Sequence, residues 1–280
     1  NNPYVDKVIS LDDDWDGMIS ALQEENYDQV IDLHHNIRTL RVKRALKNVP
    51  ARSFRKLNFR KWLLTAFRIN LLPEVHIVDR YMETVASFGV ANDGKGLDYF
   101  IPEKDHVLPE DLPISHQMGY IGIVIGAALN TKKLPVHKLR ELCEKIAYPV
   151  VLLGGKEDMA NAQMIASADT GKIYSACGKF NLNESAYLVR QAAMIITHDT
   201  GLMHIAAAFQ KPVISIWGNT VPAFGMDAYY GDSRVRDKKA EVHGLWCRPC
   251  SKIGFAKCPL GHFKCMERQD IQAIVDSVSM

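Results

Sequence analysis

The 280-residue chain is long enough for two modest domains, each with its own apolar core. Hydrophobic residues make up 47% of it and charged residues 24%, with a formal net charge of +2, which excludes a disordered or strongly charged chain. No apolar run approaches the ~20 residues that a bilayer-spanning helix needs.

The first residues alternate between strand-like and helix-like patterns. Residues 6–11, with Val8 and Ile9, read as a strand, residues 12–17 as an acidic loop, residues 18–26 as a helix and residues 27–33 as a second strand. Strand alternating with helix predicts a parallel, doubly wound sheet. Because the sequence opens on a strand with no strand–helix unit before it, we expect a fragment that lacks the first such unit.

Polar residues follow the predicted strand 27–33 at its carboxyl end, the position where open α/β sheets bind ligands. His34, Asn36 and Arg38 are therefore candidates for an acceptor-binding cleft. A solvated polar loop explains these three residues equally well.

A basic run begins at the same point. Residues 38–61 contain ten Lys or Arg and no Asp or Glu. This run predicts a local positive field that attracts phosphorylated or acidic partners, although a solvated helical face is an alternative. Nucleic acid is disfavoured, because the sequence has no RNP-like or helix-turn-helix pattern and few interleaved aromatic residues. Residues 62–67 fit an interfacial helix face or, as we expect, a segment buried in the core.

Prolines at 109 and 113 predict an inter-domain linker at residues 113–118. The linker divides an N-terminal domain, residues 1–112, from a C-terminal domain, residues 119–268. Residues 269–280 form a final amphipathic helix.

The C-terminal domain opens with a buried strand that ends at Gly126, a small-residue turn with Thr131 and Lys132, and a helix over 136–146. This arrangement lets a phosphate approach the backbone without being a Walker loop. The next strand, 149–155, is followed by Glu157. Acidic residues in this position commonly accept hydrogen bonds from ribose, but a helix N-terminus also favours them. From the residues alone, a solvent-exposed Lys132 is the expected reading.

The pattern over residues 192–220 predicts a strand (194–197), a polar turn (199–201), a helix (202–209) and a second strand (213–217). The turn contains Asp199, Thr200 and Gly201. The amide groups and positive end of the helix suit an anion such as a diphosphate. His204 lies one helical turn after Thr200 and so is on the same side of the helix, facing its N-terminal end. A capped helix with a satisfied histidine is the alternative.

Four of the six cysteines, Cys247, Cys250, Cys258 and Cys265, form a compact C-x2-C-x7-C-x6-C pattern. The spacing suits a structural zinc, while disulfide pairing and free thiols stay open. So few and so clustered cysteines argue for a reducing compartment, and we expect a cytoplasmic protein.

Several of these motifs resemble one known family. The run Asp199-Thr-Gly-Leu-Met-His204, the alanines after it, Pro212 and Trp217-Gly-Asn-Thr220 are similar to the C-terminal signature of glycosyltransferase family 9, the ADP-heptose:lipopolysaccharide heptosyltransferases. Thr131-Lys-Lys-Leu-Pro135 is similar to the family's Thr-Lys-x-x-Pro segment, with leucine where tryptophan is usual. The cysteine string also occurs in members of this family.

The resemblance implies a GT-B-like architecture, with two doubly wound Rossmann-like α/β domains and a cleft between them. It implies transfer of a heptose or similar sugar from an ADP-sugar to an anionic, lipopolysaccharide-core-type acceptor, with inversion and with no metal required for transfer. By resemblance Lys132 contacts the diphosphate, Glu157 the ribose and Phe180 the adenine. The complete donor-binding set expected is Gly126, Thr131, Lys132, Glu157, Phe180, Asp199, Thr200, Gly201 and His204.

Three further expectations accompany this interpretation. The family's general base is an aspartate in the first strand–helix loop, and no residue of this sequence matches it. The final helix is expected to pack back across the first domain, and the protein to contact the inner membrane peripherally. The rival readings are a non-catalytic nucleotide-sugar or anionic-glycan binding protein and a zinc-dependent nucleic-acid binder.

Overall fold

The computed structural model describes residues 2–11 and 14–278, which form two compact units. The larger unit combines residues 59–74 with residues from 94 onwards, and the smaller unit combines residues up to 58 with residues 75–93. Residues 12 and 13 of the predicted acidic loop lie outside the described residues.

The larger unit contains one six-stranded, wholly parallel sheet in the order β5-β4-β3-β6-β7-β8. The strands are β3 (Ile121–Val124), β4 (Val150–Leu153), β5 (Ile173–Ser175), β6 (Met194–His198), β7 (Val213–Trp217) and β8 (Asp237–Glu241). The chain runs outward from β3 to one edge and then from β6 to the other, so the strand order reverses between β3 and β6. The predicted doubly wound sheet is confirmed for this unit, and a reversal of this kind is where such sheets bind ligands.

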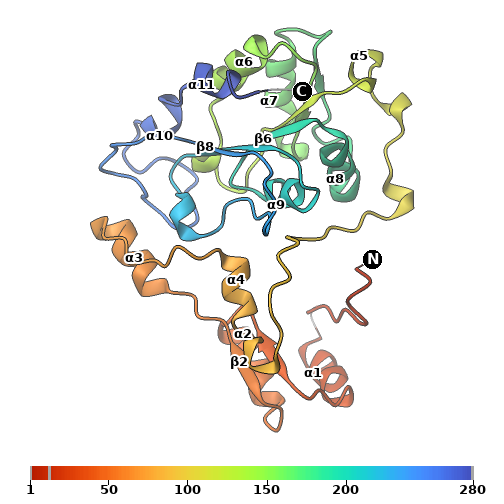
Figure 1. The fold of residues 1–280 in the computed structure, drawn as a ribbon, viewed down its shortest axis with the longest axis vertical. Coiled ribbons are helices and arrows are strands. Elements are labelled where there is room, and N and C mark those ends of the chain that lie inside the picture. Colours follow the sequence, from red (N-terminus) through yellow and green to blue (C-terminus); the bar gives the residue numbers. More distant parts are fainter. Residues whose placement is uncertain (1, 12–13, 279–280) are drawn as a thin grey trace. The chain divides into compact units, whose positions relative to one another are not determined.

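Alternate residues of the strands supply two separate apolar cores. Ile121 and Ile123 of β3 face one side, and Val124 faces the other. Helices α6 (Val136–Lys145), α7 (Met159–Ala166) and α11 (Ile271–Val275) cover the first side, while α8 (Leu182–Gln191) and α9 (Gly201–Ala208) cover the second (Figure 1). Because both faces are covered, the central strands are apolar at nearly every position.

Short elements complete the larger unit. Helix α5 (Ile114–Gln117) occupies the predicted linker, and its buried His116 places Nε2 3.1 Å from the carbonyl oxygen of Val150. Helix α10 (Lys264–Glu267) precedes α11. We expected residues 269–280 to pack back on the first domain. The buried side chains of α11, Ile271 and Ile274, lie in the core beside α6, so this apolar face is used within the larger unit.

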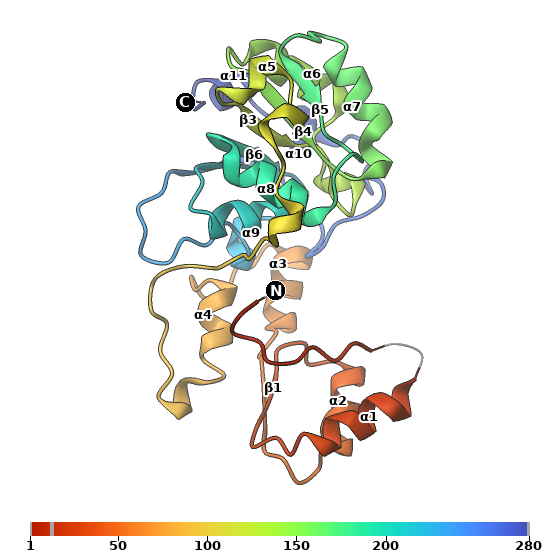
Figure 2. The same cartoon turned by 90° about the vertical axis from the view of Figure 1, so that its right-hand side faces the viewer.

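The smaller unit is built around a parallel pair of short strands, β1 (Val30–Asp32) and β2 (Ala51–Ser53), joined through α2 (Ile37–Ala45) (Figure 2). Helices α1 (Trp15–Glu24) and α4 (Ile77–Met82) complete it. The predicted strand around Val8 and Ile9 is not formed, and no third strand joins the pair within the described residues.

Helix α3 (Asn58–Phe67) contradicts the burial expected of residues 62–67. Leu64 is its only fully buried residue, whereas Phe59 is 68% exposed, Trp62 50% and Phe67 59%. Three aromatic residues therefore lie on a surface rather than in the core. Over the ranges that the structure describes, no helix has the length and apolarity needed to cross a bilayer.

Candidate nucleotide-binding site

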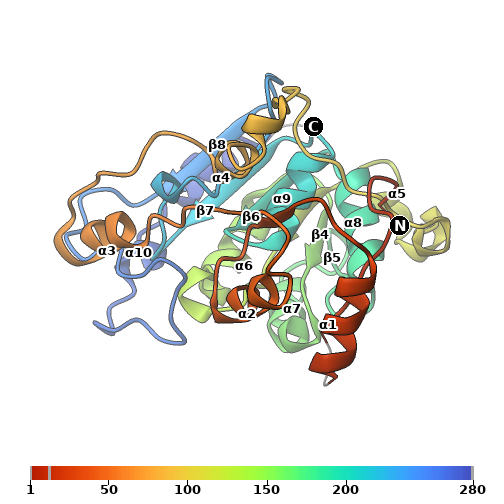
Figure 3. The same cartoon turned by 90° about the horizontal axis from the view of Figure 1, so that it is seen from below.

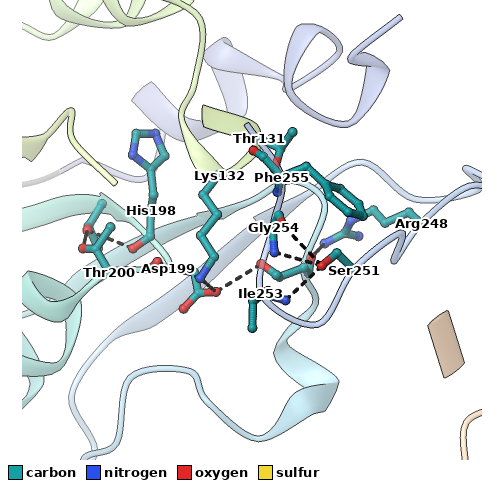
Figure 4. Close-up of polar contacts among 12 residues, drawn as sticks. Thr131, Lys132, His198, Asp199, Thr200, Arg248, Ser251, Ile253, Gly254 and Phe255 are labelled. Atoms are coloured by element: carbon teal, nitrogen blue, oxygen red, sulfur yellow. Dashed lines mark hydrogen bonds and ion pairs between the residues drawn. The ribbon is translucent and has the colours of Figure 1, made fainter. Parts of the chain in front are cut away.

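The carboxyl ends of β3, β6 and β7 bring three polar segments together at the point where the strand order reverses. Lys132, after β3, places Nζ 2.6 Å from Oδ2 of Asp199, after β6. Thr220, after β7, donates its hydroxyl to the same Oδ2 at 3.1 Å. Figure 4 shows the ammonium group of Lys132 meeting the carboxylate of Asp199. The two predicted donor residues Lys132 and Asp199 are thus brought together, and Asp199 holds the lysine beside the start of α9.

The start of α9 is open. Thr200 is the N-cap residue but makes no side-chain capping bond, and its hydroxyl lies 3.2 Å from that of Thr197. A methyl group added to Gly201 would meet no atom within 4 Å. The first amide groups of a helix lack intrahelical partners and carry partial positive charge. This helix start can therefore receive an anion next to the Lys132 ammonium group.

His198, the last residue of β6, was not assigned a role from the sequence. It is fully buried, and the backbone amide of Leu134 donates to its Nε2 at 2.8 Å. Burial lowers the pKa of His198 to about 4, so the ring is neutral near pH 7 and carries its proton on Nδ1. His198 thereby fixes the segment that carries Lys132. The sequence signal was a polar residue closing an otherwise apolar strand.

A buried carboxylate organises the neighbouring strand end. Asp158 accepts a hydrogen bond from the Gly155 amide at 3.1 Å and forms an ion pair with Lys133 at 2.8 Å. A Cβ at Gly126 would lie 2.2 Å from Oδ2 of Asp158. Gly126 therefore leaves room for this carboxylate. The sequence analysis predicted a donor contact for Gly126 and did not predict this packing role.

The cysteine-bearing segment, residues 247–265, braces the same loops. The hydroxyl of Thr131 donates to the Phe255 carbonyl at 3.0 Å and accepts from the Phe255 amide at 2.7 Å, so this predicted donor residue is already fully bonded. Arg248 donates to the Thr220 carbonyl at 3.0 Å and pairs with Glu241 at 2.6 Å. Arg248 holds the loop after β7, which in turn holds Asp199.

The other predicted donor residues lie on neighbouring elements at this edge of the sheet. Glu157 is exposed just beyond β4, and Phe180, beyond β5, is partly buried against the core shared with α8. His204 is half-buried in α9, one turn after Thr200. Their contacts with adenine, ribose and phosphate stay predictions.

The four clustered cysteines are free thiols. Cys247 Sγ lies 3.9 Å from Nε2 of His262, and burial raises the pKa of Cys265 to about 11. Among the residues that the structure describes, no three His, Cys, Asp or Glu side chains are arranged to hold a metal ion. The zinc site stays a prediction.

The smaller unit carries its own basic cavity, of about 380 Å³, which the sequence analysis missed. Three arginines line it, together with one carboxylate: Arg52, Arg55, Arg80 and Glu83. The Arg80 guanidinium is buried, stacks 4.8 Å from the centre of the Phe54 ring and donates to the Arg55 carbonyl. Because the lining carries more positive than negative charge, the cavity suits an anion.

The predicted acceptor residues lie elsewhere in this unit. His34 and Arg38 are exposed, and Asn36 caps α2 by accepting from the Thr39 amide at 3.0 Å. Their loop is held by Asp32, whose carboxylate accepts from the His35 amide at 2.6 Å and pairs with Lys43 at 2.7 Å. A role of these three residues in acceptor binding stays a prediction.

Comparisons with known proteins identify the family and the fold of the chain. Residues 16–253 match glycosyltransferase family 9 (heptosyltransferase). Lipooligosaccharide heptosyltransferase 2 of Haemophilus influenzae is 29% identical over 172 residues, which cover 59% of this chain and 47% of that protein. Lipopolysaccharide heptosyltransferase 2 of Salmonella typhimurium is 26% identical over 223 residues, covering 73% and 63%. The chain thus spans about half to two thirds of the length of these relatives.

The structure of the Escherichia coli ADP-heptose lipopolysaccharide heptosyltransferase II superposes with a TM-score of 0.65 at 18% sequence identity, covering 93% of this chain and 78% of that one. At this identity the likeness concerns the fold, and it confirms the predicted GT-B-like class.

Proposed function

Because the chain belongs to glycosyltransferase family 9, the heptosyltransferase family, we propose that it supplies the donor site of an enzyme that transfers a heptose from ADP-heptose to a lipopolysaccharide-core sugar. The observation that carries this proposal is the ion-paired Lys132 beside the open start of α9. That pairing of a cation with unfilled helix amides suits a diphosphate. A cytoplasmic location and contact with the inner membrane belong to the same proposal.

The proposed chemistry rests on stabilising the departing ADP. As the bond between the anomeric carbon and the β-phosphate oxygen breaks, negative charge grows on the diphosphate. The Lys132 ammonium group and the amides at Thr200 and Gly201 are fixed before the reaction begins, so they stabilise this charge without reorganising. Asp199 competes with the diphosphate for Lys132 and also keeps the lysine from swinging into solvent.

Inversion follows if the acceptor hydroxyl attacks the anomeric carbon from the face opposite the leaving ADP. That hydroxyl must lose its proton to a base during the attack. No residue of this chain is assigned as the base. In the proposal Glu157 binds the ribose, Phe180 packs on the adenine, and the arginine-lined cavity of the smaller unit receives an anionic group of the acceptor.

Calorimetric titration with ADP tests the donor site. Lys132→Ala removes a charge-assisted contact and is expected to weaken ADP binding roughly ten- to hundredfold. The matched control is Lys145→Ala, on the exposed face of α6 where Lys145 pairs with Glu141, and it should leave the affinity unchanged. Equal affinities for the parent protein and Lys132→Ala would contradict the proposed diphosphate site.

A second measurement separates an enzyme from a binding protein. Turnover of ADP-heptose with an extracted lipopolysaccharide-core acceptor, followed by ADP release, is expected for a transferase. Tight ADP-heptose binding with no turnover by the intact gene product would favour the rival reading, a protein that binds nucleotide sugars without transferring them.

A further inference from the structure

The segment that leads to α5 is bound to the start of α8, as Figures 1 and 3 show. Asp105 is the buried last residue of the short 3-10 helix η2 (Glu103–Asp105). Its Oδ1 accepts from the side-chain amide of Asn181 at 3.1 Å, and its Oδ2 from that of Asn183 at 2.8 Å. The Tyr99 hydroxyl donates to Oδ1 of Asn183 at 2.8 Å. The first turn of α8 is therefore held by side chains that lie 76 to 84 residues earlier in the chain.

The starts of α8 and α9 differ in what occupies them. At α8 the Asn181 side chain accepts from the Glu184 backbone amide at 3.0 Å, and the Glu184 carboxylate accepts from the Asn181 backbone amide at 2.6 Å. Two carboxylates, those of Asp105 and Glu184, thus contact the N-cap residue of α8. At α9 the N-cap residue Thr200 makes no side-chain capping bond, and the space at Gly201 is open. A diphosphate is therefore repelled from the start of α8 and favoured at the start of α9.

The spacing of the two helix starts suits the two ends of a nucleotide. Helix α8 follows β5, helix α9 follows β6, and β4 and β3 lie between these two strands. Three strand spacings put the ends of β5 and β6 roughly 14 Å apart. An extended nucleoside diphosphate separates its base from its terminal phosphate by a distance of this order. Phosphates bound at α9 thus bring the base towards the start of α8, where Phe180 directly precedes the N-cap residue.

We propose that Asp105 is a positioning residue for nucleotide binding. Its hydrogen bonds to Asn181 and Asn183 hold the first turn of α8, and with it Phe180, where the base requires them. Its charge, together with that of Glu184, keeps the phosphates at α9, so that the nucleotide binds in one orientation. The inference rests on the proposed donor site and adds to it a residue that acts on the base through Phe180.

Calorimetry with two probes, ADP and inorganic pyrophosphate, tests the proposal. Pyrophosphate has the phosphates without the base, so its affinity depends on Lys132 and α9 alone. Asp105→Asn places a donor group against two donor amides and should weaken ADP binding about tenfold while leaving pyrophosphate binding unchanged. Lys132→Ala should weaken the binding of both probes.

A milder variant and a matched control accompany Asp105→Asn. Tyr99→Phe removes only the hydroxyl bonded to Asn183 and keeps the ring, which meets Phe209 edge-on at 5.9 Å. It should weaken ADP binding roughly two- to threefold, with pyrophosphate binding unchanged. Glu103→Gln makes the same change of charge at an exposed position of η2 and should bind both probes like the parent protein.

Fluorescence gives a readout that a loss of stability alone would not change. In a Phe180→Trp variant, ADP should quench the emission of the added tryptophan by stacking, and pyrophosphate should not. Adding Asp105→Asn to this variant should reduce the quenching even at saturating ADP, because the ring is no longer held in place. Adding Glu103→Gln should leave the quenching as it was.

The outcomes separate this inference from the proposed function. Parallel losses of ADP and pyrophosphate affinity in Asp105→Asn would mean that the residue only supports the fold. Unchanged ADP affinity and quenching would mean that it has no positioning role. Either result overturns the inference while leaving the donor site intact, provided that Lys132→Ala still weakens binding. A parent protein that binds neither probe would instead contradict the donor site itself, and the inference with it.

Discussion

The two compact units hold themselves together in different ways. In the larger unit β3, β4, β6 and β7 are buried at every position, and helices cover both faces of the sheet. In the smaller unit β1 and β2 have three residues each, and only Asp32 is buried among them. The larger unit is therefore stabilised chiefly by apolar burial, and the smaller unit depends more on polar contacts.

Those polar contacts are specific. The buried Asp32 pairs with Lys43, and the buried Arg80 lies between the Phe54 ring and the Arg55 carbonyl. Buried charges need their partners, because an unpaired charge in the interior is costly. The larger unit can thus tolerate many conservative apolar changes, whereas the smaller unit is sensitive at a few charged positions.

The largest expected difference is in local stability. Hydrogen exchange measured by mass spectrometry should show the amides of β3, β4 and β6 exchanging at least about a hundredfold more slowly than those of β1 and α2, because few buried apolar contacts hold the smaller unit closed. Equal protection of the two sets of amides would show that apolar burial does not distinguish the units.

Asp32→Asn probes the smaller unit directly. Burial alone would raise the pKa of Asp32, but hydrogen bonds from Lys43, the His35 amide and Thr39 outweigh it and lower the pKa to about 2. A carboxyl with a lowered pKa stabilises the fold above its unfolded value of 3.8, and this contribution is lost as the pH falls towards 2. We expect Asp32→Asn to cost about 2 kcal/mol at pH 7.

The free energy of unfolding is measured by urea denaturation at pH 7 and at low pH. The signal that monitors unfolding must come from the smaller unit. Asp28→Asn, an exposed carboxylate in the same unit, is the matched control and should change little. A loss that persists undiminished at pH 2 would mean that the ion pair is not its source.

A smaller, pH-dependent effect is expected at His198 in the larger unit. The folded protein holds this ring neutral with a pKa of about 4, whereas the unfolded chain binds a proton near pH 6.5. The stabilisation is therefore complete above pH 6.5 and is lost as the pH falls towards 4. Between pH 6.5 and 5 the free energy of unfolding should drop by about 1.5 kcal/mol from this residue.

Two variants isolate the role of His198. His198→Gln keeps an acceptor for the Leu134 amide and should remove the pH dependence while retaining most of the ADP affinity. His198→Leu leaves that amide unpaired, at a cost of about 1–3 kcal/mol, and should loosen the Lys132 segment and weaken ADP binding. If both variants bound ADP like the parent, His198 would have no positioning role.

The accuracy of the sequence predictions also differs between the two units. The reason is again that the larger unit depends on apolar burial and the smaller unit on polar contacts. The strands β3, β4, β6 and β7 were predicted within three residues at either end, because long runs of Val, Ile and Leu have few other interpretations. Strand β8, with the sequence Asp-Lys-Lys-Ala-Glu, was missed because its polar pattern does not mark a buried strand. The smaller unit was predicted least well, since its short strands and buried charges leave weak patterns.

In the candidate site, too, some residues were predicted from the sequence and others were missed. Lys132 was predicted as a site residue only through the resemblance of Thr131–Pro135 to a family segment, whereas Asp199 and Gly201 stand in the polar turn directly after a predicted strand. The role of His198 was missed because its partner, Leu134, lies 64 residues earlier in the chain. Arg80 was missed because only tertiary packing places it in a cavity with Arg52 and Arg55. The exposure of Trp62 and Phe67 reversed the expected burial, since the sequence of an apolar helix face does not reveal whether that face packs in the core or lies on the surface.

At position 201 the requirements of folding and of ligand binding are expected to differ. Its backbone is not left-handed and a methyl group there would touch nothing, so neither local geometry nor packing demands a glycine. A variant library selected only for well-folded protein would accept many residues at position 201. If the proposed donor site is correct, the same library selected for growth that depends on sugar transfer would return glycine, because a side chain would fill the space that the proposal assigns to the phosphates. A difference between the residues that the two selections accept at position 201 would show how much space the donor requires there.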